Sequence, residues 1–166
     1  DFPGPHQGNF CSNGILPATR HESAKLKEVK AAHEFVKFAL TNIDPKDNTV
    51  GVRVYNNYAF TALDAYDLKY EVVRDGRVAG SRTVRLGAVA PGDSLTLALK
   101  LPKAGLAKAA AAGIETLLNL RVLCREAQRH APAGHEVAAR QITLVERGAL
   151  PELKSTAKAP LAKTRA

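Results

Sequence analysis

The sequence predicts a mainly β fold, an immunoglobulin-like antiparallel β-sandwich preceded by a loop and one short helix. Between residues 34 and 147, apolar side chains recur at every second position, as they do on half-buried strands. Turn-forming residues interrupt this alternation about every 8–12 residues, which divides the segment into about seven short strands. An apolar content of 45% suffices for one core, built from Val, Leu and Ala because Trp and Met are absent. A small β-barrel is the alternative fold.

Residues 1–33 are expected to form the loop and the helix. Glycine and proline occur too densely in residues 1–18 for regular structure. A capping box, Thr19 followed by Glu22, predicts the start of a helix that runs to about Ala32. Leu26, Val29 and His33 lie near one face of this helix, so its apolar stripe is narrow. An isolated helix of this kind is unstable, so it must dock on the following domain or on another neighbour.

The alternating segment predicts the strands in order. They are expected over residues 35–40, 50–55, 68–73, 78–86, 95–101, 118–124 and 137–145. In the fourth of them, residues 82–86 either extend or follow the return strand of a hairpin. Asp75-Gly76 predicts the tight turn of that hairpin, because glycine accepts the positive φ of a type I′ turn. Residues 104–113 fit a short helical turn or an extended loop. Residues 148–166 show no periodicity and are expected to form a basic extended tail.

The composition excludes several classes of function. A formal net charge of +8 points to nucleic acid, but the basic residues alternate with acids and apolar residues, and aromatic side chains for base stacking are few. We therefore expect a solvated basic surface and no nucleic-acid partner. No segment approaches the ~18 apolar residues of a membrane span, so no membrane partner is expected either. No signal peptide is visible, and the sequence leaves the cellular compartment unknown.

Two cysteines, Cys11 and Cys124, occur in different contexts. No Cys/His spacing typical of zinc surrounds them, and two cysteines do not make a disulfide framework. We expect two separate thiols, with Cys124 as a small core residue on its strand.

Several segments carry a resemblance to a known family. Residues 9–14 read NFCSNG, between a Gly- and Pro-rich segment and Ile15-Leu16. Residues 56–61 read NNYAFT, and residues 66–76 read YDLKYEVVRDG. Weaker matches are VAPG at 89–92 and HEVA at 135–138. In their order and spacing, these segments resemble family 2 glycoside hydrolases of the β-galactosidase type.

The resemblance assigns two of the three segments of the chain. Residues 1–33 correspond to the last loop and helix of a catalytic TIM barrel, and residues 34–147 to the immunoglobulin-like β-sandwich that follows it. The third segment, the basic extended tail at residues 148–166, lies beyond the resemblance. The family pattern is not complete. Tyr70 stands where the family usually has Trp, and Ala139 and Ile142 replace aromatic residues of the last strand. These changes remove aromatic bulk and leave open whether the parent enzyme is active.

No catalytic residue and no cofactor-binding residue is expected in this chain. A retaining glycosidase needs two carboxyl groups about 5–5.5 Å apart. The resemblance implies that both glutamates lie on earlier barrel strands, outside this sequence. The acidic residues present are better explained as turn formers or surface charges: Asp44, Asp47, Asp64, Asp67 and Asp75. We therefore expect the chain to be inactive as a glycosidase by itself.

One metal site is implied by the resemblance. In the family, the Phe of the NFCSNG-like run offers its main-chain oxygen to a sodium ion beside the galactosyl pocket, and the second Asn offers its side-chain oxygen. The matching residues are Phe10 and Asn13. Hard cations select oxygen ligands, which agrees with this donor pair. The remaining ligands would come from an intact parent enzyme, so in this chain alone the two residues are plain loop residues.

The function implied is that of the non-catalytic β-sandwich portion of a β-galactosidase-type enzyme. The parent hydrolyses terminal β-galactosides, and the portion seen here supports the barrel and the active-site loop. Its partners are then the remainder of a glycosidase or other protein subunits, with a galactoside bound only in an intact parent. The alternative is a diverged domain that serves as a scaffold or interaction subunit of a larger assembly. The missing aromatic residues and the basic tail motivate that alternative.

Overall fold

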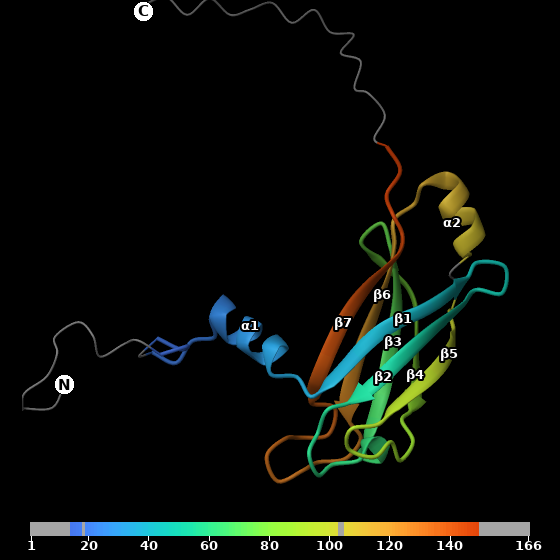
Figure 1. The fold of residues 1–166 in the computed structure, drawn as a ribbon. Coiled ribbons are helices and arrows are strands. Elements are labelled where there is room, and N and C mark those ends of the chain that lie inside the picture. Colours follow the sequence, from blue (N-terminus) through green and yellow to red (C-terminus); the bar gives the residue numbers. More distant parts are fainter. Residues whose placement is uncertain (1–13, 18, 103–104, 150–166) are drawn as a thin grey trace, which may run out of the picture.

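The computed structural model describes residues 14–17, 19–102 and 105–149. This part of the chain forms two antiparallel sheets packed face to face, and helix α1 projects from one end (Figure 1). The elements, in chain order, are α1 (Ala24–Ala32), β1 (Val36–Asp44), β2 (Thr49–Asn56), the 3-10 helix η2 (Leu63–Ala65), β3 (Tyr66–Arg74), β4 (Arg77–Arg85), β5 (Ser94–Lys100), α2 (Leu106–Ala112), β6 (Thr116–Cys124) and β7 (Glu136–Val145).

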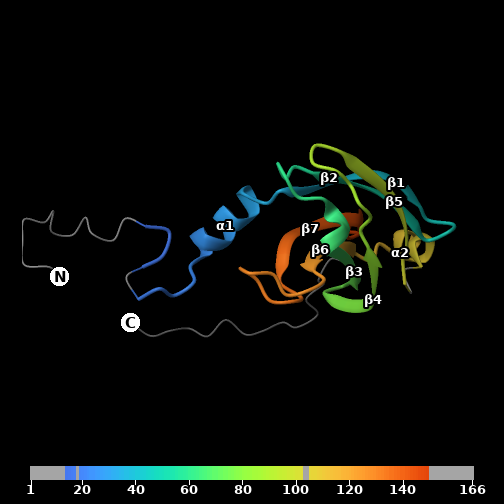
Figure 2. The same cartoon turned by 90° about the horizontal axis from the view of Figure 1, so that it is seen from below.

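The two sheets have the strand orders β1-β2-β5 and β4-β3-β6-β7 (Figure 2). The predicted β-sandwich is thereby confirmed, and the small barrel is wrong because the strands form two separate sheets. The place of β4 differs from that in an antibody constant domain, where the fourth strand shares a sheet with the first, second and fifth. Here β4 pairs with β3 through the hairpin that joins them.

The core lies between the sheets and is filled from alternate strand positions. Val50, Val52 and Val54 of β2 are fully buried, as are inward-facing residues of β3 and β6 that include Leu68, Val72, Leu118, Leu120 and Val122. Cys124 is 2% exposed at the end of β6, as predicted. Its burial raises the pKa of its thiol above the ordinary value.

Two open points of the sequence analysis are resolved. β4 runs without interruption from Arg77 to Arg85, so residues 82–85 extend the return strand. The Ala-rich segment is helical over Leu106–Ala112, and left-handed glycines precede and follow it. The predicted hairpin turn is also confirmed, since Asp75 and Gly76 have φ of 44° and 75°. Positive φ at both central positions defines a type I′ turn.

The predicted capping box at the start of α1 is wrong. The helix begins at Ala24 with Ser23 as its N-cap residue, and the Ser23 hydroxyl donates to the carbonyl of Ile15 rather than accepting from the first turn. Arg20 has a φ of 59°, and its N–H donates to the carbonyl of Pro17. The chain therefore turns at the position where the helix was expected to start. Within the described ranges, neither α-helix has the length and hydropathy needed to cross a membrane.

Candidate functional site

The residues predicted to bind sodium, Phe10 and Asn13, lie outside the described residues, as does Cys11. The sodium hypothesis therefore stays a prediction. Among residues 14–17, 19–102 and 105–149, no three His, Cys, Asp or Glu side chains gather in a way that could hold a metal ion.

Three of the acidic residues considered above make structural contacts. The Asp44 carboxylate accepts from the N–H of Lys46 at 2.9 Å and of Asp47 at 3.1 Å, which closes the β1–β2 turn. Asp75 lies 3.3 Å from the guanidinium of Arg147. Asp67 was expected to flank a turn, but it lies on β3.

The partner of Asp67 was not foreseen. Its carboxylate accepts from Nε of Arg125 at 3.0 Å, and Nη2 of Arg125 also donates to the carbonyl of Tyr66. Arg125 follows the end of β6, 58 positions from Asp67 in the sequence. This ion pair could be predicted from the sequence only if the pairing of β3 with β6 were already known.

The surface most suited to a function is the end of the sandwich from which α1 projects (Figure 1). We call it the α1 end. It comprises the α1–β1 junction at residues 33–35, the loop 57–62, η2, the loop 86–93 and the loop 125–135. These segments are far apart in the sequence, and strand pairing brings them together at one end of the sandwich.

Asn56 fixes two of these loops. It is the last residue of β2 and is fully buried. Its side-chain NH₂ donates to the carbonyls of Thr61 at 2.8 Å and Val89 at 2.9 Å, and its Oδ1 accepts from the N–H of Tyr58 at 3.0 Å. Both amide hydrogens and the amide oxygen are thus engaged, as a buried amide requires. The loops 57–62 and 86–93 are held to β2 and to each other.

A series of stacked aromatic rings lies beside this amide. The rings of Phe35 and Tyr58 are 5.0 Å apart between centroids, and those of Tyr58 and Tyr66 are 6.0 Å apart. Tyr66 is buried, Tyr58 is half-buried, and Phe35 is 51% exposed. Burial, together with the interaction with Tyr66, raises the pKa of the Tyr58 hydroxyl well above its ordinary range. The stack runs from the core to the surface beside α1 and stays uncharged at neutral pH.

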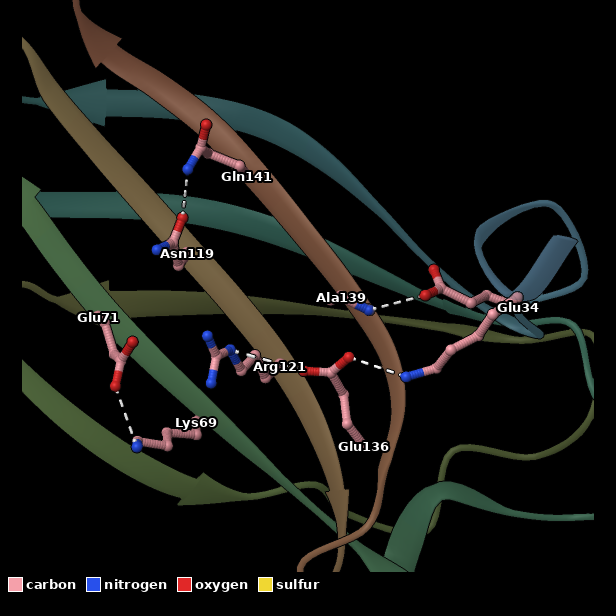
Figure 3. A network of polar contacts seen from close by, with 9 residues as sticks. Glu34, Lys69, Glu71, Asn119, Arg121, Glu136, Ala139 and Gln141 are labelled. Carbon is pink, nitrogen blue, oxygen red and sulfur yellow. Dashed lines mark hydrogen bonds and ion pairs between the residues drawn. The ribbon is translucent and has the colours of Figure 1, made fainter. Parts of the chain in front are cut away.

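Helix α1 itself is attached to the sandwich by polar contacts rather than by packing. Lys30 Nζ lies 2.9 Å from a carboxylate oxygen of Glu136 on β7, and Arg121 Nε lies 3.6 Å from the other. The N–H of Ala139 donates to Glu34 at 3.1 Å (Figure 3). No residue of α1 is buried. A groove of about 650 Å³ separates the helix from β7, with Leu26 on one side and Ala139 on the other.

Replacing Glu136 by glutamine is expected to loosen α1 with little effect on global stability. The Lys30–Glu136 pair is partly exposed, so its loss costs about 0.5 kcal/mol. This corresponds to about twofold faster exchange of the α1 amide hydrogens, which hydrogen–deuterium exchange measures. Glu71→Gln is the matched control, because Glu71 pairs with Lys69 on the same sheet without touching α1. Equal α1 exchange in wild type and Glu136→Gln would contradict the attachment.

The fold and the site define a β-sandwich module with one elaborated end, and comparison with known proteins gives its family. The family described as "Beta-galactosidase, domain 4" matches residues 52–145, and the chain belongs to this family. The resemblance noted in the sequence to proteins of the β-galactosidase type is confirmed.

Three curated relatives are much longer than this chain. A β-galactosidase of Priestia megaterium is 33% identical over 151 residues, which cover 91% of this chain and 14% of the relative. β-Galactosidase 2 of Enterobacter cloacae is 33% identical over 136 residues, covering 81% and 12%. A β-galactosidase of Halalkalibacterium halodurans is 32% identical over 134 residues, with the same coverage of 81% and 12%. The chain therefore spans about one seventh or less of the length of these relatives.

The role of Asn56 was not predicted from the sequence, although the residue begins the motif NNYAFT. The sequence does contain a signal that Asn56 is buried and bonded. Asn56 continues the inward-facing phase of Val50, Val52 and Val54, and an amide at a core position needs hydrogen-bond partners. The contact of Glu136 with Lys30 had no such signal, because the two residues are 106 positions apart.

Proposed function

We propose that this chain is the non-catalytic β-sandwich portion of a β-galactosidase-type glycoside hydrolase, whose intact form hydrolyses terminal β-galactosides. The observation that carries this proposal is the family match over residues 52–145 together with the fraction of the relatives that the chain spans. The matched relatives are named β-galactosidases, and most of their length lies outside the region shared with this chain.

The role of the sandwich in that enzyme is structural: it supports the barrel and positions the loop before α1. The attachments of Lys30 and Glu34 to β7 support this proposal, because they fix the direction in which α1 leaves the sandwich. Phe10 and Asn13 precede α1 in the sequence. In the intact enzyme, the main-chain oxygen of Phe10 and the side-chain oxygen of Asn13 would be ligands of a sodium ion, completed by residues from elsewhere.

The test measures hydrolysis of a chromogenic β-galactoside by two samples. One is the purified 166-residue chain, and the other is the natural polypeptide that carries this sequence, isolated from its source and weighed by mass spectrometry. We expect no hydrolysis by the chain, and hydrolysis by a polypeptide several times heavier than 17.7 kDa. Turnover by the 166-residue chain alone would overturn the non-catalytic assignment.

The alternative is a diverged domain that acts as a scaffold or interaction subunit. Large exposed apolar side chains favour a protein partner, among them Phe35 at 51% and Phe60 at 97% exposure. This alternative predicts a natural polypeptide of about 18 kDa. It would copurify in an assembly that does not cleave the galactoside.

A further inference from the structure

Phe60 has an environment unlike that of Tyr58, the other aromatic residue of its motif. In the segment NNYAFT, Asn56 holds the loop, Tyr58 stacks between Phe35 and Tyr66, and the carbonyl of Thr61 accepts from Asn56. Phe60 is 97% exposed, the highest value among the large apolar side chains of the described ranges. Within those ranges, the sandwich gives three members of the motif a role and leaves the Phe60 ring in solvent.

The loop that carries Phe60 is held at several points. Asn56 accepts from Tyr58 and donates to Thr61, so it bonds the backbone on both sides of Phe60. The N–H of Asn57 donates to the carbonyl of Phe35 at 2.8 Å. A ring presented by an ordered loop loses little further conformational freedom when it binds. Aromatic residues, phenylalanine among them, are enriched in protein interfaces relative to the rest of the surface.

The location of Phe60 indicates what covers it. The hydrogen bond from Asn57 to Phe35 ties the loop to the residue that lies between α1 and β1. Phe35 is half exposed, and Leu26 and Val29 of α1 are only partly buried. Apolar surface is thus present both at the α1–β1 junction and on α1, which leads away from the sandwich at this end (Figure 1). The described residues that precede α1, 14–17 and 19–23, lie on this side of the molecule (Figure 1).

We propose that Phe60 and Phe35 form the apolar centre of the interface between this sandwich and the catalytic portion of the intact glycosidase. The proposal rests on the proposed function. The partner surface is the portion of the same polypeptide to which α1 leads. A relative that shares 151 aligned residues with this chain is much longer, since the chain spans only 14% of it. A pocket on that portion receives the ring of Phe60, and the ordered loop sets the orientation of the sandwich against it.

The experiment compares Phe60→Ser with Val78→Ser in both the 166-residue chain and the intact natural polypeptide. Val78 is 61% exposed on β4, next to the hairpin at the other end of the sandwich, and is the matched control. In the 166-residue chain, both variants are expected to have the same midpoint denaturant concentration of unfolding as the wild type, since neither side chain is buried. In the intact polypeptide, Phe60→Ser is expected to raise the rate of heat inactivation about tenfold, and Val78→Ser to leave it unchanged.

Limited proteolysis gives a second measurement that does not depend on activity. Trypsin is expected to cut at Lys30 or Lys37, beside the junction, about tenfold faster in intact Phe60→Ser than in wild type. The proposal is overturned if Phe60→Ser and Val78→Ser behave alike in an active polypeptide. It is also overturned if Phe60→Ser abolishes a dimer of the 166-residue chain in light scattering, since the occupant is then a second copy. An inactive polypeptide of about 18 kDa instead overturns the proposed function, whatever the effect of Phe60.

Discussion

Replacing Asn56 by alanine is expected to destabilise the folded chain by about 3 kcal/mol. The substitution removes three hydrogen bonds and leaves the N–H of Tyr58 and the carbonyls of Thr61 and Val89 without that partner. A buried polar group without a partner costs about 1–3 kcal/mol, and water reaches the partly buried groups of the loop. The measurement is urea unfolding followed by circular dichroism, because the chain contains no Trp.

Asn57→Ala is the control for this prediction. Asn57 is the next residue in the same loop and is exposed, so its loss is expected to change the free energy of unfolding by less than about 0.5 kcal/mol. The two variants remove the same side chain one position apart. Similar unfolding midpoints for both would show that the buried amide does not hold the loops. The loop 57–62 would then lack the fixed geometry on which the orientation of Phe60 depends.

The fold was predictable from the sequence where the signal is local. Val50, Val52 and Val54 alternate with polar or small residues, and the strand they predict is β2 with one further residue at each end. Asp75-Gly76 predicted a hairpin because both residues tolerate positive φ. The place of β6 between β3 and β7 had no local signal, since it depends on contacts between segments distant in the sequence.

The helix start shows why a local pattern can fail. Thr19 and Glu22 have the residue types and spacing of a capping box. The pattern does not describe the backbone, and Arg20 adopts a left-handed conformation that a helix cannot include. The helix therefore begins after this turn, at Ala24.

The candidate site was predictable only in part, for a related reason. Its residues come from segments that meet only after the two sheets have formed, as with Lys30 and Glu136. The motif NNYAFT marked the correct segment, but the separate roles of Asn56 and Phe60 depend on which side chain the fold buries. The exposure of Phe60 depends on the conformation of the loop, so the residue types of the motif do not predict it.

Replacing Tyr70 by alanine is expected to destabilise the chain by about 4 kcal/mol, and replacing it by phenylalanine by about 1 kcal/mol. Tyr70 is 2% exposed on β3, and its hydroxyl donates at 3.0 Å to the carbonyl of Lys100 on β5, in the opposite sheet. Loss of the ring leaves a cavity between the sheets. Loss of the hydroxyl alone removes one hydrogen bond and leaves the Lys100 carbonyl without that donor.

Urea unfolding of both variants separates the contribution of the ring from that of the hydroxyl. Tyr55→Phe is the control, because Tyr55 lies half-buried on β2 and its removal leaves the Tyr70 hydroxyl bond intact. If Tyr70→Phe is as stable as wild type, the bond between the sheets contributes nothing measurable.

Tyr70→Trp introduces the residue that the resemblance described in the sequence analysis implies for this position. Its larger ring must fit a core already filled around tyrosine, and it lacks the oxygen that reaches Lys100. We expect a loss of about 1–3 kcal/mol from overpacking. An unchanged or higher stability would mean that the space between the sheets is set by the strands, and that the tyrosine fills it incompletely. The expected loss would instead mean that the neighbouring core, rich in Val and Leu, is packed around the smaller ring and its hydroxyl.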